Sequence, residues 1–520
     1  MTDGPPASLS HPADPAVSPS SRRRGRVLVL NRWAAPGCAA LLIFFTCGYF
    51  QNSRPGWNVN SQFGLTAAIA ERGTLRIDLY HNRPETETGD KAFFEGHYYS
   101  DKSPVTAFLG VPAFWAYAAA VKAMGRAVDY DAARYWVTWL TIGAAAAVLA
   151  GLLTGMLQSE GVPPARAARA GALWIAATPL LTYAILFFNY LPACAMALGG
   201  LLLTAPAWRP DAAAPACTRL LLGGLLLGLA AWTLNTMALA ALVVAVGLAA
   251  GLIRRERSAG GVARAFAPWA LGCLLGVAGQ MGYTLALFGE VASPYAYEAD
   301  PFFREQMARG FMGATRPRAW VAWLVTFHPF QGLFLWFPIV LVALLGVFAR
   351  LAGKRAGRTD ALIALAIFAG LLLYNSAYFM WWGGWAYAPR HLIPALPFLA
   401  SGLAGWLGSQ RRAVRRAVLG LALIGAVFNV AALALDPQPP PGLLQEELMA
   451  PEMVDAWPSP FLALQRYVWL GNQTDNNWGT ALGLTGWASL VPLWIVWGVA
   501  LILFGRLDGP RRGAAERAAP

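Results

Sequence analysis

Residues 51–104 gather the side chains of this chain that are best suited to acid–base chemistry. The stretch reads QNSRPGWNVNSQFGLTAAIAERGTLRIDLYHNRPETETGDKAFFEGHYYSDKSP. It contains the aspartates Asp78, Asp90 and Asp101, and near its end Lys102 follows Asp101, with His97 and Tyr99 just before them. A carboxylate can act as a general base toward a hydroxyl or an amine, and a lysine can bind a phosphate as a point charge. For any one of these acids, the alternative is a solvated loop charge.

A second group of candidates lies where the chain enters an apolar run near residue 391. The sequence from Trp381 to Pro397 reads WWGGWAYAPRHLIPALP. Tryptophans such as Trp382 are typical of the aromatic belt at a membrane boundary. The guanidinium fork of Arg390, at the step into the apolar run, suits phosphate oxygens. We therefore expect Trp382, Arg390 and His391 to contribute to substrate binding, with interfacial anchoring as the alternative.

Two further polar segments contain candidate groups, and those of the second segment would suit a sugar. Residues 293–330 include Tyr295, Glu298 and His328. Residues 471–483 read GNQTDNNWGTALG, and they supply hydroxyl-binding groups and a stacking face at Asn472, Asp475, Asn476, Asn477 and Trp478. The histidines His97, His328 and His391 all fall in segments expected on one side of a membrane. A divalent metal is therefore left open, although no ligand spacing within one element predicts a metal site.

The composition indicates that these groups belong to a membrane protein. Of the 520 residues, 57% are hydrophobic and 13% are charged, and the mean hydropathy is +0.46. A soluble protein would carry roughly a quarter charged residues. Apolar runs of about 18–25 residues follow one another, each long enough to cross a bilayer. The net charge of +13 comes from short basic clusters between these runs, which is the pattern of cytoplasmic loops rather than of a nucleic-acid-binding surface.

The basic clusters also set the expected topology, because arginine- and lysine-rich loops stay in the cytoplasm. We predict an all-α polytopic fold of about twelve transmembrane helices with both termini cytoplasmic. Its parts are a disordered N-terminus (1–27), a transmembrane domain (28–506) and a cytoplasmic tail (507–520), with outer loops at 51–131, 288–331, 380–390 and 437–486.

The apolar run 105–124 does not fit a simple alternation of spans. The loop before it and the span 132–156 after it both require that the run begin and end on the outer side. We therefore expect 105–124 to lie along the outer surface as an interfacial helix, although a true span is the alternative. A first surface helix is expected from Ser61 to Arg72, ending at Gly73, so that an acidic loop lies between two juxtamembrane helices.

Two motifs resemble those of a known family. The segments GHYYSDKSP, ending at Pro104, and WWGGWAYAPRHLIPALPFL are similar to motifs of the GT-C superfamily of polyprenyl-phosphate-sugar glycosyltransferases. The similarity is to the bacterial branch that resembles the protein O-mannosyltransferases and the lipid A aminoarabinose transferase. Those relatives carry an acid–Lys–Pro–Pro pattern, which Asp101-Lys102 matches, with Ser103-Pro104 in place of the two prolines. Many of them place a catalytic aspartate directly after the first span, where this chain has Asn58 to Ser61.

The resemblance implies roles for several of these residues. Lys102 would bind the phosphate of the carrier, with Arg390 as a helper. The base would come from later in the first loop than the family's usual position, in the order Asp90, Asp101, Asp78. The expected substrate-binding set is completed by His97, Tyr99, His391 and Trp382.

These observations predict a membrane glycosyltransferase, either a hexosyl- or a pentosyltransferase, in the bacterial cytoplasmic (inner) membrane. It would move a sugar from a polyprenyl-phosphate carrier to a lipid, glycan or protein acceptor at the outer face, as part of cell-envelope synthesis. A polyprenyl-linked glycan ligase or polymerase is an alternative that would depend on Arg390 and His391 more than on a first-loop carboxylate. A lipid or solute transporter would need ionisable residues inside its spans, and the apolar runs carry almost none.

Overall fold

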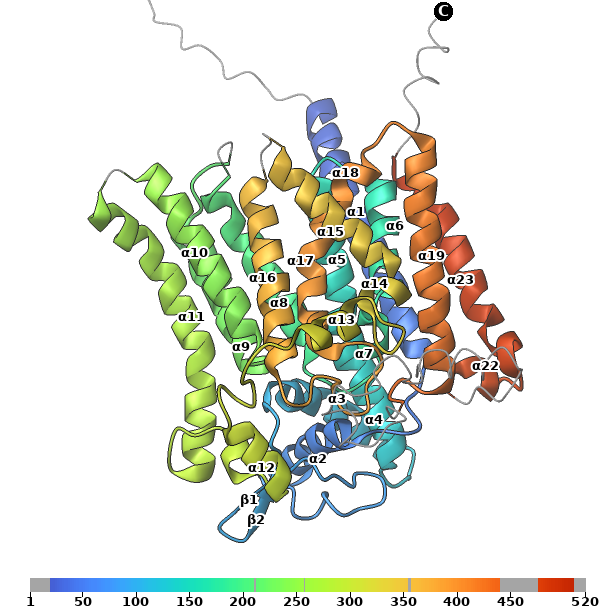
Figure 1. Ribbon diagram of the computed structural model, residues 1–520. Coiled ribbons are helices and arrows are strands. Elements are labelled where there is room, and N and C mark those ends of the chain that lie inside the picture. The colour runs from blue at the N-terminus through green and yellow to red at the C-terminus, as the bar shows by residue number, and fades with distance from the viewer. Residues whose placement is uncertain (1–18, 210–211, 257, 354–356, 440–475, 509–520) are drawn as a thin grey trace, which may run out of the picture.

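The structure, a computed structural model, describes residues 19–209, 212–256, 258–353, 357–439 and 476–508. Within these ranges the chain is a bundle of helices that run side by side, with one short β-hairpin (Figure 1). Eight of the described helices are long and apolar enough to cross a membrane, which confirms an all-α membrane protein. The total of about twelve spans stays a prediction. Parts of the predicted N-terminus, last outer loop and tail (1–18, 440–475 and 509–520) lie outside the described residues.

The helices of the bundle follow the apolar runs of the sequence, because each run satisfies its backbone groups internally as a helix. In the first half they are α1 (Pro19–Tyr49), α4 (Tyr130–Thr138), η1 (Trp139–Gly143), α5 (Ala144–Ser159), α6 (Pro164–Ala176), α7 (Leu180–Tyr183), α8 (Tyr190–Thr204), η2 (Ala205–Ala207), α9 (Cys217–Thr233), α10 (Met237–Arg255) and α11 (Ala259–Phe288). In the second half they are α14 (Leu333–Trp336), α15 (Pro338–Ala352), α16 (Arg358–Ala377), η4 (Arg390–Ala395), α17 (Leu396–Leu399), η5 (Ala400–Gly402), α18 (Leu403–Leu407), α19 (Arg412–Leu435), η7 (Gly486–Leu490), α23 (Val491–Leu503) and η8 (Phe504–Asp508).

Small residues let two of the long helices approach closely. A Cβ built on Gly224 of α9 would lie 1.9 Å from the backbone oxygen of Trp269 in α11. A Cβ on Gly272 of α11 would lie 2.0 Å from the backbone oxygen of Leu221 in α9. Close backbone approach through glycines is the packing mode expected between helices in lipid, where no hydrophobic effect drives them together.

The remaining elements gather at one end of the bundle (Figure 1). They are α2 (Trp57–Arg72), β1 (Ala92–Phe94), β2 (His97–Tyr99), α3 (Val105–Ala123), η3 (Pro294–Tyr297), α12 (Pro301–Ala308), α13 (Ala319–Thr326) and α22 (Trp478–Ala481). The strands β1 and β2 form an antiparallel hairpin in which Phe93 pairs with Tyr98. We refer to residues 51–123 as the cap. As predicted, α2 ends at Gly73, whose φ of 61° provides the left-handed cap, and α3 begins directly after Pro104.

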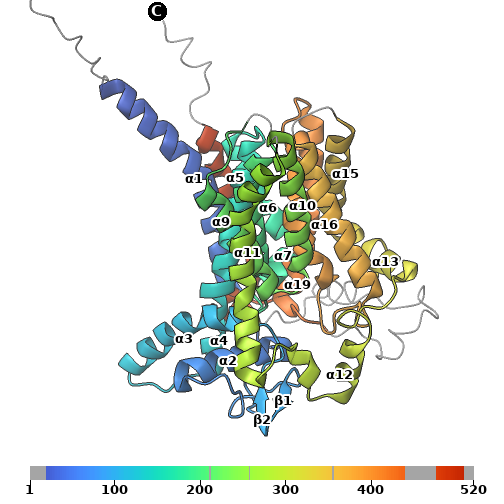
Figure 2. The same cartoon turned by 90° about the vertical axis from the view of Figure 1, so that its left-hand side faces the viewer.

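Helix α3 crosses the end of the bundle instead of running along it. By length and hydropathy alone, Val105–Ala123 would qualify as a membrane span. Figure 2 shows, however, that α3 leaves the bundle sideways, and it packs against α2 and α4. The indole nitrogen of Trp115 donates to the backbone oxygen of Ala70 in α2 at 2.9 Å. This arrangement agrees with the expected surface helix, and it leaves Leu109 and other apolar side chains of α3 exposed.

Candidate active site

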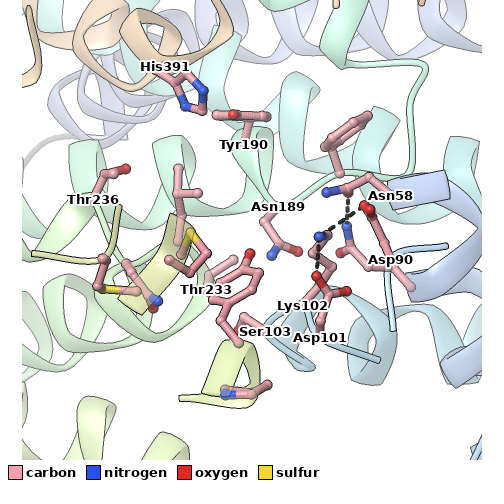
Figure 3. A pocket seen from close by; sticks show the side chains of 18 of the residues that line it. Asn58, Asp90, Asp101, Lys102, Ser103, Asn189, Tyr190, Thr233, Thr236 and His391 are labelled. Atoms are coloured by element: carbon pink, nitrogen blue, oxygen red, sulfur yellow. Dashed lines mark hydrogen bonds and ion pairs between the residues drawn. The ribbon is translucent and has the colours of Figure 1, made fainter. Parts of the chain in front are cut away.

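A cavity of about 200 Å³ lies between the cap and the bundle (Figure 3). The cap contributes Asn58, Gln62, Asp90, Asp101, Lys102 and Ser103, and the bundle contributes residues from the start of α8, the α9–α10 connection and the segments 294–312 and 374–391. His391 and Tyr190 lie across this pocket from Asp101 and Lys102 (Figure 3). The pocket is therefore lined by both motifs singled out from the sequence, the one with Asp101-Lys102 and the one with Arg390-His391, which are almost 300 residues apart in the chain.

Asp90 is held in the pocket by short-range contacts to α2. The hydroxyl of Thr88 donates to the backbone oxygen of Trp57 at 2.8 Å, and the backbone N–H of Asp90 donates to the same hydroxyl at 3.0 Å. The amide of Asn60 donates to the backbone oxygen of Glu87 at 2.9 Å. These bonds hold residues 87–90 against the first turns of α2. The position of Asp90 is therefore set by contacts to α2, two residues ahead of strand β1.

The Asp101-Lys102 pair is anchored on both sides. Before it, the hydroxyls of Ser100 and Ser61 are 2.8 Å apart in a buried contact that ties the pair to α2. After it, the hydroxyl of Ser103 donates to the backbone oxygen of Trp232, near the end of α9, at 2.6 Å. Ser103 thus links the cap to the bundle.

Lys102 lies between two carboxylates. Its Nζ is 2.9 Å from Oδ2 of Asp90, and it also donates to Oδ2 of Asp101, as the dashed lines in Figure 3 show. The ring centroid of Tyr295 is 5.3 Å from the same Nζ. Burial opposes the charge of Lys102, but Asp101 and Asp90 together raise its pKa well above the usual value. The lysine is therefore a fixed cation at neutral pH.

The acids around Lys102 differ in accessibility. The side chain of Asp90 is 24% exposed, whereas that of Asp101 is 1% exposed. Burial raises the pKa of Asp101, Lys102 opposes this effect, and Asp90 adds to it. Glu298 is a third carboxyl group, buried close to Asp101, and burial together with Asp101 raises its pKa to about 9. At neutral pH the pocket thus combines an accessible carboxylate at Asp90 with a protonated carboxyl at Glu298.

Arg390 lines the other side of the pocket without an acid of its own. Its guanidinium carbon is 5.8 Å from the ring centroid of Phe188. Its Nε is buried and has no hydrogen-bond partner among the described residues, and the same holds for Nε2 of His391. None of the ion pairs formed within the described part of the chain includes Arg390. Buried polar atoms without partners are rare in proteins, so these two are candidates to contact a ligand.

Four of the predicted site residues lie outside the pocket. Asp78 accepts the backbone N–H of Tyr98 at 2.7 Å, and its Oδ2 is 2.8 Å from Nδ1 of His97, so both side chains stabilise the hairpin. The ring of Tyr99 packs 5.9 Å from that of Phe288. Trp382 is buried, and its backbone oxygen accepts from the side chain of Gln331 at 3.1 Å.

The asparagines proposed as sugar-binding groups have structural partners. Asn476 donates to the backbone oxygen of Leu435 at 2.7 Å and accepts from Ser53. Asn477 accepts the backbone N–H of Thr480 at 3.1 Å and donates to the hydroxyl of Ser489 at 3.1 Å. Asn472 and Asp475 lie outside the described residues. Across the described ranges, no three or more His, Cys, Asp or Glu residues are grouped to hold a metal ion.

Several pocket residues were not among the predicted site residues. Asn58 lines the pocket and accepts from the side-chain amide of Gln62 at 2.7 Å. Glu298 and Tyr295 come from a segment nearly 200 residues further along the chain. The sequence offered one signal for them, an acid directly after two tyrosines in a polar outer segment, but nothing linked that segment to Lys102.

Comparisons with known proteins give only distant similarities. No protein-family model matches the sequence, and no curated protein matches it. Among solved structures, the chain is similar to ArnT from Cupriavidus metallidurans, with undecaprenyl phosphate bound (16% identity, TM-score 0.46) and in the apo state (14% identity, TM-score 0.47), each covering 94% of this chain and 78% of that chain. It is also similar to the Archaeoglobus fulgidus oligosaccharyltransferase in complex with zinc and sulfate, at 14% identity and TM-score 0.38 over 78% of this chain and 52% of that chain.

Proposed function

We propose that the protein is a membrane glycosyltransferase that takes its sugar from a polyprenyl-phosphate carrier. This proposal rests on one observation: Asp90, Lys102 and Arg390 line the same pocket, which lies between the cap and the bundle. An accessible carboxylate facing two cations provides a proton acceptor and a phosphate site within one cavity.

Arg390 is the side chain best placed to receive the phosphate. It is a cation with no acid partner within the described residues, and its buried Nε lacks a hydrogen bond. A guanidinium can donate two parallel hydrogen bonds to phosphate oxygens. Lys102 adds a second positive charge, which Asp101 keeps in place from its buried position. Both cations would stabilise the charge that develops on the leaving phosphate.

Asp90 is the proposed general base. Its carboxylate would accept the proton of an acceptor hydroxyl or amine as that atom attacks the anomeric carbon of the sugar. The bond between the anomeric carbon and the phosphate oxygen breaks in the same step, and polyprenyl phosphate leaves with its electron pair. One in-line displacement inverts the configuration at the anomeric carbon. Of the three candidate aspartates, Asp90 is the one that is both in the pocket and accessible.

The rest of the pocket wall supports a lipid-linked donor. Part of it is apolar and flexible, formed by Phe303, Met307, Met312, Phe379 and Met380. Methionine side chains adapt to irregular apolar ligands because they are unbranched and polarisable. Such a wall suits the first isoprene units of a carrier. The proposal further places the cap on the outer face of the bacterial inner membrane with both termini in the cytoplasm, on the basis of the basic loops.

A polyprenyl-linked glycan ligase is the second candidate. It is favoured by one observation, namely that Arg390 and His391 are neighbours in the pocket and that each has a buried nitrogen without a partner. In that case these two residues would carry the reaction, and Asp90 would only hold Lys102. The two functions therefore differ in their dependence on Asp90.

The test is sugar transfer by the purified protein in proteoliposomes made with bacterial membrane lipids and glycans as acceptors. The donors are undecaprenyl phosphates carrying labelled hexoses or pentoses, and the readout is label that leaves the carrier and becomes covalently attached. We expect Asp90→Asn to lower the rate roughly 10²–10⁴-fold, and Glu87→Gln, an exposed acid of the same loop, to leave it unchanged. Full transfer by Asp78→Asn, Asp90→Asn and Asp101→Asn alike would refute the proposal. Dependence on His391 with Asp90 dispensable would favour the ligase.

A further inference from the structure

A second cavity, of about 320 Å³, lies at the end of the bundle opposite the cap. It is a groove between α6, α15, α18 and α19, and its rim carries five arginines, Arg166, Arg169, Arg412, Arg415 and Arg416. The first turns of α6 and of α19 both lie at this end of the bundle (Figure 1). Nothing in the proposed transfer reaction uses this groove.

The groove changes from charged to apolar along its length. On α6, Arg166 and Arg169 precede Leu173 and Trp174, and at a rise of 1.5 Å per residue the step from Arg166 to Trp174 covers about 12 Å. On α19 the arginines likewise precede the apolar lining residues Val418, Leu419 and Ala422. Leu419 is 41% exposed, so the groove is open along α19. Cations at the bundle end and an apolar slot leading away from them match the two parts of a lipid, a headgroup and a chain.

Within the described residues, no acid forms an ion pair with any of the five rim arginines. Arg166 and Arg169 each donate to a backbone oxygen at 2.9 Å, those of Leu407 and Leu501. The described residues provide neither a hydrogen bond nor an ion pair for the side chains of Arg412 and Arg416, and no rim arginine forms an ion pair with a described acid. Asp508 is close by, but it accepts the backbone N–H of Ala165 at 2.9 Å.

Two other acids at this end are already paired with arginines away from the groove. Glu160 lies 3.0 Å from Arg350, and Asp360 lies 3.0 Å from Arg209. The rim arginines therefore repel one another across the groove, and an anion would relieve this repulsion. Trp174 supplies an independent observation, because it lines the groove and its indole N–H is buried without a hydrogen-bond partner.

We propose that this groove binds an anionic glycerophospholipid. The headgroup phosphate lies among the rim arginines, and one acyl chain lies in the slot against Leu173, Trp174 and Leu419. Basic pockets between transmembrane helices are suited to anionic lipid headgroups, because guanidinium forks match phosphate oxygens and the side chains reach the membrane boundary. The apolar slot distinguishes a lipid from free phosphate. The described residues that line the groove include no carboxylate and therefore no general base. Lipid binding in this groove does not depend on the proposed transfer reaction.

The test measures lipid binding to the full chain, purified and delipidated in detergent. Phosphatidylglycerol is titrated and its binding is followed by native mass spectrometry and by thermal stability. We expect saturable binding to the wild type, weakened roughly tenfold or more in Arg412→Gln/Arg416→Gln, since each basic residue near a lipid surface contributes appreciably to binding. These two side chains are exposed and make no hydrogen bond or ion pair with the part of the chain that the structure describes, so the double variant keeps the fold. Arg412→Lys/Arg416→Lys should restore most of the affinity.

The matched control is Arg254→Gln/Arg264→Gln, which removes two exposed charges next to the α10–α11 connection. It should bind phosphatidylglycerol like the wild type. An equal loss in this control would overturn the proposal in favour of a general surface charge effect. If zwitterionic phosphatidylcholine binds as tightly as phosphatidylglycerol, the arginines do not select the lipid. If inorganic phosphate displaces phosphatidylglycerol at an equal concentration, the apolar slot does not contribute to binding.

Discussion

The Nζ of Lys102 lies 2.9 Å from Oδ2 of Asp90. One of the two cations assigned to the carrier phosphate is thus bound to the carboxylate that is assigned to the acceptor. Asp101 is buried on the other side of Lys102, and it stabilises the positive charge of the lysine even when Asp90 is not in contact with it. A phosphate that draws Lys102 toward itself would therefore release Asp90 for proton transfer. In this arrangement donor binding and activation of the base are the same event.

This exchange predicts opposite effects of Asp90→Asn on binding and on turnover. Removing the negative charge takes away a competitor for Lys102, so the affinity for undecaprenyl phosphate should rise roughly fivefold, which corresponds to about 1 kcal/mol for a partly exposed ion pair. Sugar transfer should be lost. Tritiated undecaprenyl phosphate bound to protein in detergent measures the affinity. Weaker binding by Asp90→Asn would show that the two groups do not compete.

Gly383→Ala should displace Arg390. The φ of Gly383 is 82°, and a Cβ there would lie 2.8 Å from Cγ of Arg390. The variant should therefore lose affinity for undecaprenyl phosphate as Arg390→Gln does, and backbone strain should cost about 1 kcal/mol of stability. Binding of the labelled carrier and thermal unfolding measure the two effects separately.

The neighbouring glycine provides the control for that variant. Gly384 also has a positive φ, 69°, but a Cβ there would meet only the sulfur of Met380, at 3.7 Å. Gly384→Ala should show the same loss of stability and keep the affinity for the carrier. If both variants bind the carrier equally well, the position of Arg390 does not depend on Gly383.

Glu298 should make the stability of the protein depend on pH. Its pKa rises from about 4.5 to about 9 on folding, chiefly through burial. Between these values the folded chain holds a proton that the unfolded chain has released, so the free energy of unfolding falls as pH rises toward 9. One proton contributes at most about 1.4 kcal/mol per pH unit. Glu298→Gln should flatten the decline of the unfolding temperature between pH 6 and pH 9. As a control, Glu305→Gln, which changes an exposed neighbouring acid, should show the same fall in unfolding temperature as the wild type. If Glu298→Gln also shows the wild-type fall, other titrating groups cause the pH dependence.

The helices were predictable because their signals are local. The apolar runs, the glycine at the end of α2 and the proline before α3 each act within a few residues, and the structure has these ends where the sequence indicated them. The Asp101-Lys102 pair and Arg390 were also found, since each belongs to a short motif. All three line the same pocket.

What the sequence could not supply was the pairing of distant segments. Asp90 ranked first and Asp78 last among the three candidate bases, but the sequence did not show their partners: the hairpin turns Asp78 toward the backbone of Tyr98 and leaves Asp90 facing Lys102. Similarly, Glu298 reaches the site because its backbone forms an isolated bridge with Ala92. A contact between segments about 200 residues apart has no local periodicity, so only the fold reveals it.

A separate ion-pair network at the other end of the bundle should matter for stability alone. Asp360, at the start of α16, accepts the indole N–H of Trp208 at 2.8 Å and pairs with Arg209 at 3.0 Å. Asp360→Asn leaves the arginine with only the more distant Glu160, at 3.7 Å, and should cost roughly 3 kcal/mol, as expected when one partner of a largely buried pair is removed. Thermal unfolding in detergent measures the loss, and the exposed variant Glu256→Gln should show none. Because the pocket lies at the opposite end of α16, carrier binding by Asp360→Asn should stay normal at low temperature, and a specific loss of binding would instead connect this network to the site.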